Sequence, residues 1–258
     1  MSNILFLVKE RIKHFFSASG PKKVHSPWLY SLYRAIKDQN TLSCDKKMII
    51  RNRRRQLAGN KSALEFDDPG SRGGRVQSTV KEVFSRTSKP CRQAVAIAEV
   101  AAYVNEGSIL ELGTAFGTTT MAIRFANANR KIITVEGVAE IAAYSKETLS
   151  FDSNTEIIIG RFADVVPELA KSGEKFGMVF IDGHHSRRPT LDYLEMLQPA
   201  LAEKALVVID DIYYSKDMFQ CWQELKSHAD FQVKLDFFYF GLLVRNPDLS
   251  PEVLKLRI

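Results

Sequence analysis

The chain has 258 residues, of which 45% are hydrophobic and 26% charged, a balance that is typical of a soluble globular protein and excludes a fibrous or disordered one. This length suffices for one large α/β domain with an appendage, but it is too short for two complete catalytic domains. The formal net charge of +6 permits an acidic or nucleic-acid partner without requiring one.

The cysteines and the hydropathy of the chain indicate the cellular compartment in which the protein is expected. The three cysteines are widely spaced and form no C-x-x-C pair, so we expect neither a disulfide framework nor a zinc knuckle. A reducing compartment such as the cytoplasm is the simplest interpretation. No apolar run approaches the ~20 residues that span a bilayer, so the sequence predicts no transmembrane segment.

The first predicted element is an amphipathic helix over residues 3–16, which Gly20 and Pro21 end. Its apolar face consists of Leu5, Val8, Ile12, Phe15 and Phe16. Such a face can attach to a membrane surface or to a partner. Most amphipathic helices face a protein core, so we expect this one to pack on its own domain or on a second copy in a homodimer.

A second helical pattern follows His25-Ser26-Pro27, and after it residues 46–61 carry seven lysines and arginines and no acid. This basic segment could meet phosphates. It could also be a solvated helix face or a lid, and the lack of interleaved aromatic residues favours that interpretation. Residues 66–74 are rich in Gly and Asp and contain Pro69, so they predict a long loop. We therefore expect residues 1–104 to form a helical and loop extension that serves as a substrate lid or an oligomer contact.

The most informative stretch comes next, where residues 108–112 form a short apolar run that predicts a buried strand. The chain then passes through Gly113 and Gly117 into a helical pattern that begins with three threonines. Glycines in such a turn let the backbone approach a ligand, and the unpaired N–H groups of the helix start can face it. The alternative is an ordinary strand-to-helix turn of an α/β domain.

Strands and helices alternate from there on, which predicts a parallel sheet with helices on both faces. The further strands are expected at residues 131–135, 156–159, 178–181 and 205–209, and the helices at 139–149, 165–171, 190–197 and 216–228. Residues 231–235 and 238–244 lie too close together for a crossover helix, so they should pair as an antiparallel hairpin.

The turn itself departs from the dinucleotide fingerprint, because Ala115 stands where that fingerprint needs its second glycine. A cofactor without a pyrophosphate suits Glu111-Leu-Gly113-Thr-Ala-Phe-Gly117 better. This stretch resembles the first motif of the class I S-adenosylmethionine-dependent methyltransferases, and most closely that of the magnesium-dependent catechol-type and sugar O-methyltransferases. The resemblance implies a doubly wound, mostly parallel, seven-stranded Rossmann-like sheet over residues 105–258, with the terminal antiparallel hairpin.

The resemblance also implies which residues hold S-adenosylmethionine. Glu136 ends the second strand, where a carboxylate can accept hydrogen bonds from both ribose hydroxyls. Phe162 is expected beside the adenine ring, with a stacking or edge contact. The complete expected cofactor set is Glu111, Gly113, Thr114, Ala115, Gly117, Thr118, Thr119, Glu136, Gly137, Phe162, Ala163 and Asp182.

Three further acids end strands, namely Asp182, Asp210 and Asp211. Carboxylates that meet at one edge of a sheet repel one another unless a cation lies between them, and oxygen ligands suit Mg²⁺. The resemblance implies that these three aspartates bind the metal, which would activate an acceptor hydroxyl. The alternative is that Asp211 caps the following helix while Asp210 contacts the cofactor.

A proton acceptor is expected next to this site, in Asp182-Gly183-His184-His185. Imidazole titrates near neutral pH and suits a general base. His185 aligns with the catalytic lysine of the catechol-type enzymes, and His184 is the other candidate. The predicted reaction is O-methylation of a small molecule such as a diol, sugar or phenol.

Other chemistries fit less well. Residues 182–185 lack the Pro-Pro turn of the base-amine methyltransferases, and Cys91 precedes the first strand and so cannot serve as a cytosine C5 nucleophile. Two alternatives stay open: a metal-independent methyltransferase of the same fold, and a basic nucleic-acid-binding protein that keeps the fold without catalysis.

Overall fold

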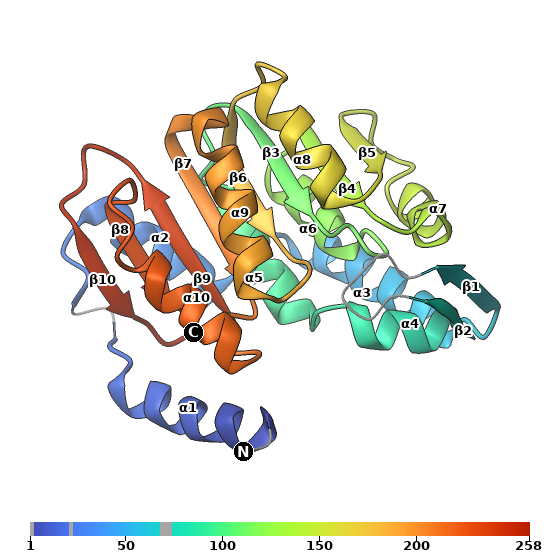
Figure 1. The fold of residues 1–258 in the computed structure, drawn as a ribbon, viewed down its shortest axis with the longest axis horizontal. Coiled ribbons are helices and arrows are strands. Elements are labelled where there is room, and N and C mark those ends of the chain that lie inside the picture. Colours follow the sequence, from blue (N-terminus) through green and yellow to red (C-terminus); the bar gives the residue numbers. More distant parts are fainter. Residues whose placement is uncertain (1–2, 21–22, 68–73) are drawn as a thin grey trace.

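The computed structural model describes residues 3–20, 23–67 and 74–258, and it is built around one eight-stranded sheet (Figure 1). The strand order is β10-β8-β9-β7-β6-β3-β4-β5. Five of these strands run parallel to one another, as the alternation of strand and helix patterns predicted. They are β3 (Ser108–Leu112), β4 (Ile132–Glu136), β5 (Thr155–Ile159), β6 (Phe176–Ile181) and β7 (Leu201–Asp210).

The predicted terminal hairpin is confirmed by β8 (Val233–Asp236) and β9 (Phe240–Arg245), which pair antiparallel. Strand β9 also pairs antiparallel with β7 and so joins the hairpin to the parallel strands. A further strand, β10 (Glu252–Lys255), adds to β8 in the parallel direction, so the sheet has eight strands rather than the expected seven. This strand has four partly exposed residues, and so short a segment carries no clear alternation of buried and exposed side chains.

Helices cover both faces of the sheet, which confirms the doubly wound arrangement (Figure 1). Side chains of α8 (Phe162–Lys171), α9 (Arg187–Leu197) and α10 (Lys216–Leu225) form one core with the sheet. The other core contains side chains of α2 (Pro27–Asp38), α5 (Cys91–Ala101) and α6 (Thr118–Ala126). Helix α7 (Ala139–Thr148) lies between β4 and β5 along the chain.

The N-terminal region contains more regular structure than the sequence predicted. Helix α2 begins after Ser26, whose hydroxyl accepts a hydrogen bond from the Leu29 N–H. The basic segment lies mostly in α3 (Cys44–Gly59), followed by an antiparallel pair, β1 (Ala63–Asp67) and β2 (Arg75–Thr79), and by α4 (Val80–Thr87). The expected loop at 66–74 is therefore partly strand, and its residues 68–73 lie outside the described part of the chain.

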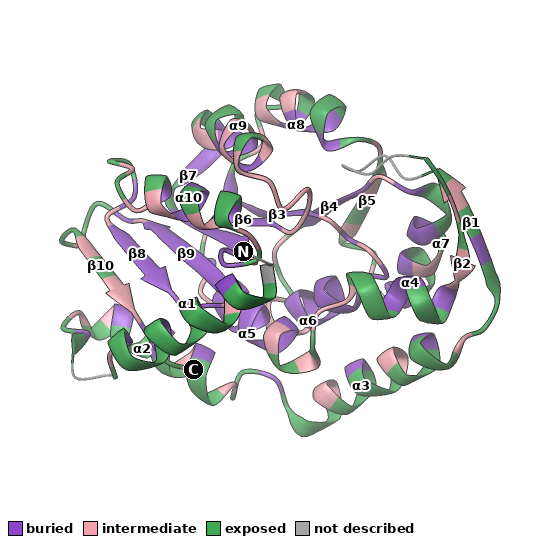
Figure 2. Cartoon of the chain, turned by 60° about the horizontal axis from the view of Figure 1, so that its bottom comes forward, coloured by how far each residue is buried: buried purple, intermediate pink, exposed green. Residues whose placement is uncertain are grey.

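Two of the N-terminal helices belong to the core of the sheet, because Leu32 and Tyr33 of α2 and Ile97 of α5 are fully buried in it. Helix α1 (Asn3–Ser17) differs from both, since it lies outside the two helical layers and presents mainly exposed residues (Figures 1 and 2). None of the described helices is both long and apolar enough to cross a membrane.

Candidate functional site

The turn after β3 contains two glycines with positive φ, and the first of them lies against the end of β6. Gly113 has φ +109°, and a Cβ added there would lie 2.0 Å from the carbonyl oxygen of Asp182. Only glycine allows the ends of β3 and β6 to approach this closely. Gly117 has φ +74° and precedes the first turn of α6. The turn thus brings the start of α6 and the end of β6 to the same edge of the sheet.

Glu111 does not reach the ligand side of this turn. Its carboxylate is fully buried, and Oε2 accepts hydrogen bonds from the hydroxyls of Thr120 and Thr134 at 2.5 and 2.7 Å. Burial raises the pKa of Glu111 to about 7, although these two hydroxyls act in the opposite direction. Its Oε1 has no hydrogen-bond partner among the described residues. Glu111 therefore supports the turn from beneath.

A cavity of about 740 Å³ opens at the carboxyl ends of β3, β4, β6 and β7, where open α/β sheets bind their ligands. Several of the residues predicted for the site line it: Gly113, Ala115, Glu136, Gly137, Phe162, Asp182, His184, His185 and Asp211. The remaining predicted residues do not line it: Glu111, Thr114, Gly117, Thr118, Thr119, Ala163 and Asp210. Most of that second group is buried beneath the turn, and Ala163 is exposed on α8.

Glu136 is fixed at the end of β4 by the backbone. Its Oε2 accepts a hydrogen bond from the Ala115 N–H at 2.8 Å, and its Oε1 accepts one from the Val138 N–H at 2.9 Å. Burial raises the pKa of Glu136 to about 7, and these backbone donors lower it only in part. The carboxyl group lines the cavity and keeps further lone pairs for a ligand.

An aromatic wall, which includes Phe162 and His184, lines the same cavity. The ring of Phe162 lies 5.5 Å from that of His184 and 6.0 Å from that of Tyr193. A Cβ at Gly183 would lie 2.4 Å from Phe162 Cε2, so the glycine makes room for the ring. His184 belongs to this wall, with its Nδ1 3.5 Å from the Tyr193 hydroxyl.

A cluster of charged side chains forms the other part of the cavity. Ligand atoms of Asp182, His185 and Asp210 lie within 4.8 Å of one another, which makes these residues candidate metal ligands. Asp211 lines the cavity, and Ser215, not Asp211, caps helix α10 by accepting from the Met218 N–H. The helix-cap alternative for Asp211 is therefore wrong.

Lys89 enters this cluster from the loop between α4 and α5, and the sequence analysis did not identify it. Its Nζ donates a hydrogen bond to Asp182 Oδ1 at 2.8 Å and another to Asp210 Oδ2. The side chains of Lys89 and Asp210 are only 9% and 5% exposed. The ammonium group therefore lies between the two carboxylates that the sequence assigned to a metal.

The charges of the cluster are unequal. Burial alone would lower the pKa of Lys89, but Asp182, Asp210 and Asp211 raise it above its ordinary value, so the ammonium stays protonated. Burial raises the pKa of Asp210 and Asp211, against the attraction of Lys89. With the carboxyl groups ionised, one ammonium faces three carboxylates, so the cluster attracts further positive charge.

Four residues of the cavity have an unusual backbone conformation, with positive φ at residues that are not glycine. They are Ala115, His184, His185 and Asp211, with φ between 39° and 60°. The described chain has only two other such residues, Gln39 and Phe238. Backbone strain of this kind concentrates at functional sites, because packing holds a side chain where the reaction needs it.

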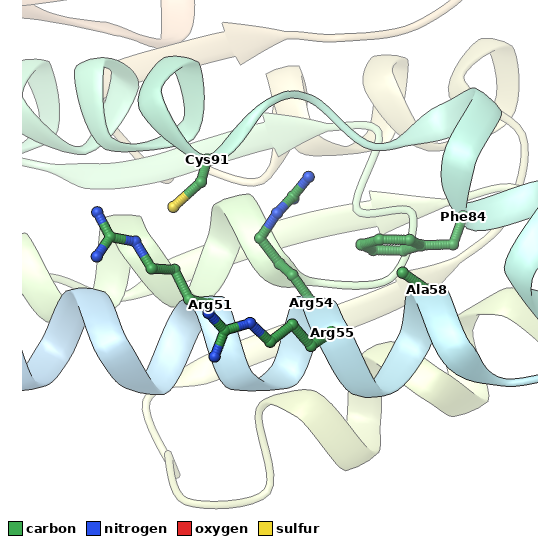
Figure 3. A pocket seen from close by; sticks show the side chains of 6 residues that line it. All are labelled: Arg51, Arg54, Arg55, Ala58, Phe84 and Cys91. Carbon is green, nitrogen blue, oxygen red and sulfur yellow. The ribbon is translucent and has the colours of Figure 1, made fainter.

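A second, smaller cavity of about 280 Å³ lies beside α3, and arginines of the basic segment line it (Figure 3). Arg51, Arg54 and Arg55 line it together with Phe84 and Cys91. Arg54 donates to the Thr118 hydroxyl at 3.0 Å, so it attaches α3 to the start of α6. The neighbouring Arg53 likewise pairs with Glu147 of α7 at 2.9 Å. Part of the basic segment thus has a structural role.

Comparison with solved structures identifies the same fold elsewhere. The S-adenosylhomocysteine-bound methyltransferase PaMTH1 of Podospora anserina superposes with a TM-score of 0.55 at 14% identity, over 62% of this chain and 80% of that one. A putative caffeoyl-CoA O-methyltransferase from Staphylococcus aureus gives 0.54 at 17% identity, over 79% and 100%. The O-methyltransferase TomG from Streptomyces achromogenes gives 0.52 at 19%, over 62% and 82%.

Comparison of sequences points the same way. No curated protein matches the chain. A family model described as a methyltransferase domain matches residues 110–212, which run from β3 through β7 to the start of the following loop and include the turn and the aspartates. The match identifies a methyltransferase domain over these residues, and the solved methyltransferases share its fold.

Proposed function

We propose that this protein transfers the methyl group of S-adenosylmethionine to a hydroxyl oxygen of a small molecule. The observation that carries the proposal is the cavity of about 740 Å³, in which a carboxylate, an aromatic wall and a charged cluster face one space. Two of the solved neighbours are described as O-methyltransferases, which supports oxygen as the acceptor.

The adenosine part of the cofactor fits the side of Glu136 and Phe162. Ionised Glu136 accepts hydrogen bonds from the ribose hydroxyls, while Ala115 and Val138 keep its carboxylate in place. Phe162 packs against the base. Gly113 lines the cavity at the end of β3, where the remainder of the cofactor would pass, and the surplus negative charge of the aspartates favours the cationic sulfonium.

The acceptor then lies against the charged cluster, on the side of His185. The acceptor oxygen attacks the methyl carbon, a C–O bond forms, the C–S bond breaks, and its electron pair stays on sulfur. The proton of the hydroxyl passes to the imidazole of His185, whose ring nitrogen can act as a general base. His185 supports this role better than His184 because it belongs to the carboxylate cluster, whereas His184 belongs to the aromatic wall. Most of the acceleration comes from positioning.

The divalent metal that the resemblance implies would have to bind within this cluster. The chemistry of the donors suits such an ion, since Asp182, Asp210 and His185 each offer one ligand atom and these atoms lie within 4.8 Å of one another. The space between the two carboxylates, however, holds the ammonium of Lys89. A metal and an ammonium cannot share that space, so Mg²⁺ does not fit this arrangement.

We therefore propose the metal-independent form of the reaction. Lys89 supplies the positive charge that keeps Asp182 and Asp210 together, and its remaining donor capacity can hold the acceptor oxygen. The role of residues 1–104 as a lid is part of the same proposal, because Phe66 and Val76 of the β1–β2 pair and Val83 of α4 line the cavity.

Calorimetric titration with S-adenosylmethionine tests the cofactor assignment. Glu136→Ala should weaken binding roughly 10- to 100-fold, the loss expected for hydrogen bonds to a charged group. Glu140→Ala is the matched control, since Glu140 is exposed one turn further along, in α7. Equal affinities of both variants and the unaltered protein would refute the proposed adenosine site.

The metal question has a separate test, which does not require the acceptor to be known. The unaltered protein should give no heat on titration with Mg²⁺, and Lys89→Met should bind it, because removal of the ammonium frees the carboxylates of Asp182 and Asp210. Once a screen of diols, sugars and phenols provides an acceptor, activity should persist in excess chelator. Tight Mg²⁺ binding by the unaltered protein, with activity lost in chelator, would restore the metal-dependent mechanism.

A further inference from the structure

Helix α1 carries its large apolar side chains on the outside of the molecule. Six of them are between 49% and 79% exposed: Ile4, Leu5, Val8, Ile12, Phe15 and Phe16. At 100° per residue these six positions fall within about 120° of the helix circumference. They form one continuous stripe, which we call the α1 stripe. The expectation that this face packs on its own domain is wrong.

The opposite face of α1 packs on the protein, although it contains polar side chains. Phe6, Glu10 and His14 follow one another at intervals of four residues and are all buried. The ring of Phe6 contacts that of Phe219 at 5.9 Å, edge to face. His14 Nε2 lies 3.1 Å from Asp236 Oδ1.

Asp236 anchors this face firmly. Burial alone would raise its pKa, but the interaction with His14 and the hydrogen bond from the Tyr213 hydroxyl lower it below its ordinary value. The carboxylate also accepts from Trp222 Nε1 at 3.2 Å. Because the buried side of α1 is tied to a charged group inside the protein, the helix cannot rotate its stripe inward without breaking these contacts.

The charges around the stripe have one sign. Lys9 and Arg11 border it on its two sides, Lys13 lies beyond Lys9, and all three are exposed. The only acid of the helix, Glu10, is on the buried face, where it pairs with Lys13 at 2.6 Å. An apolar stripe with basic edges complements a surface that is apolar inside and negatively charged at its rim.

We propose that α1 anchors the protein to the surface of a bilayer that contains anionic lipids. The stripe would enter the boundary between head groups and acyl chains, while Lys9 and Lys13 meet the head groups. A second copy of the chain is a poorer occupant, because two stripes face to face would align basic edges without an acid between them.

The anchor lies close to the cavity. Tyr213 contacts the His14 ring, and the neighbouring Tyr214 and Asp211 line the cavity, so one short loop after β7 touches both. Helix α1 lies on the side of the sheet to which the carboxyl ends of β3 and β6 point (Figure 1). A bound bilayer would therefore lie on the cavity side of the protein.

Vesicle sedimentation with the full chain tests this proposal. The protein should pellet with vesicles of mixed phosphatidylcholine and phosphatidylglycerol, and much less with phosphatidylcholine alone. The double variant Ile12→Gln with Phe16→Gln should reduce binding at least about tenfold, since it removes two apolar groups from the stripe. The matched control is Ile159→Gln with Phe151→Gln, which changes two side chains of the same types, 43% and 53% exposed, away from α1.

A second pair of substitutions tests the basic residues that border the α1 stripe. Lys9→Gln with Lys13→Gln should weaken binding to the anionic vesicles by about tenfold and make the remainder less sensitive to salt. Unchanged melting temperatures show that the variants are folded. The proposal fails if no vesicle binds, or if both apolar double variants lose binding equally. It also fails if sedimentation equilibrium shows a dimer that the stripe variant abolishes while vesicles are ignored, since a second copy would then cover the stripe.

Discussion

The two walls of the cavity are built by different means. On the side proposed for the adenosine, called the adenosine wall below, a tight turn and backbone N–H groups hold one carboxylate, Glu136, and every partner lies within the turn or next to the strand end. On the acceptor side, Lys89 pairs with Asp182 and Asp210, which are 93 and 121 residues away along the chain. The first wall thus depends on local backbone geometry, and the second on long-range charge pairing.

The largest expected effect concerns the backbone of the adenosine wall. Gly113→Ala should destabilise the protein by more than about 4 kcal/mol, because the new Cβ would overlap the Asp182 carbonyl and the left-handed backbone would be strained as well. Gly173→Ala is the control: its φ is +82°, but nothing lies within 4 Å, so about 1–2 kcal/mol is expected. Thermal or denaturant unfolding measures both. Equal losses would show that the close approach of β3 and β6 is unimportant.

This difference between the walls also explains what could be predicted from the sequence. The strands, the turn at Gly113 and the acids at the strand ends follow from local patterns, and the structure places Glu136 and Asp182 beside one cavity. Lys89 stands in Ser88-Lys89-Pro90, which carries no motif, and only the packed fold brings it to the aspartates.

Two further differences between the expectations from the sequence and the structure have similar causes. Glu111 was expected at the ligand, but β3 is buried on both faces, and its alternation turns Glu111 toward Thr134 of the neighbouring strand. The amphipathic pattern of α1 predicted the helix but not its orientation, because the pattern does not say which face meets the protein. Only the buried His14 and Asp236 decide that.

The next effect concerns the charge pair of the acceptor wall. Lys89→Met should cost about 3–5 kcal/mol of unfolding free energy, because it leaves Asp182 and Asp210 buried next to each other without a counter-ion. Lys204→Met removes an exposed pair with Asp248 and should cost less than about 1 kcal/mol. Denaturant midpoints of the two variants provide the comparison. A small loss for Lys89→Met would mean that water reaches the aspartates and that the pair is not a structural element.

The smallest effect is a pH dependence of stability that originates beneath the adenosine wall. Burial raises the pKa of Glu111 from 4.5 to about 7. The protonated carboxyl group therefore stabilises the folded protein fully at a pH below 4.5, and this stabilisation is lost as the pH rises through about 7. At about 1.36 kcal/mol per pH unit, this loss amounts to about 3 kcal/mol. Glu136 has the same shift and contributes a second loss of similar size.

Glu111→Gln cannot ionise, so it should remove about 3 kcal/mol of the fall in unfolding free energy between about pH 4.5 and about pH 8. Urea unfolding at several pH values measures this, with Glu65→Gln on the exposed strand β1 as control. If the variant kept the full fall, Glu111 would be ionised in the folded protein, and its unpartnered Oε1 would need a cation or water beneath the turn. The local wall would then depend, like the acceptor wall, on a buried charge and its partner.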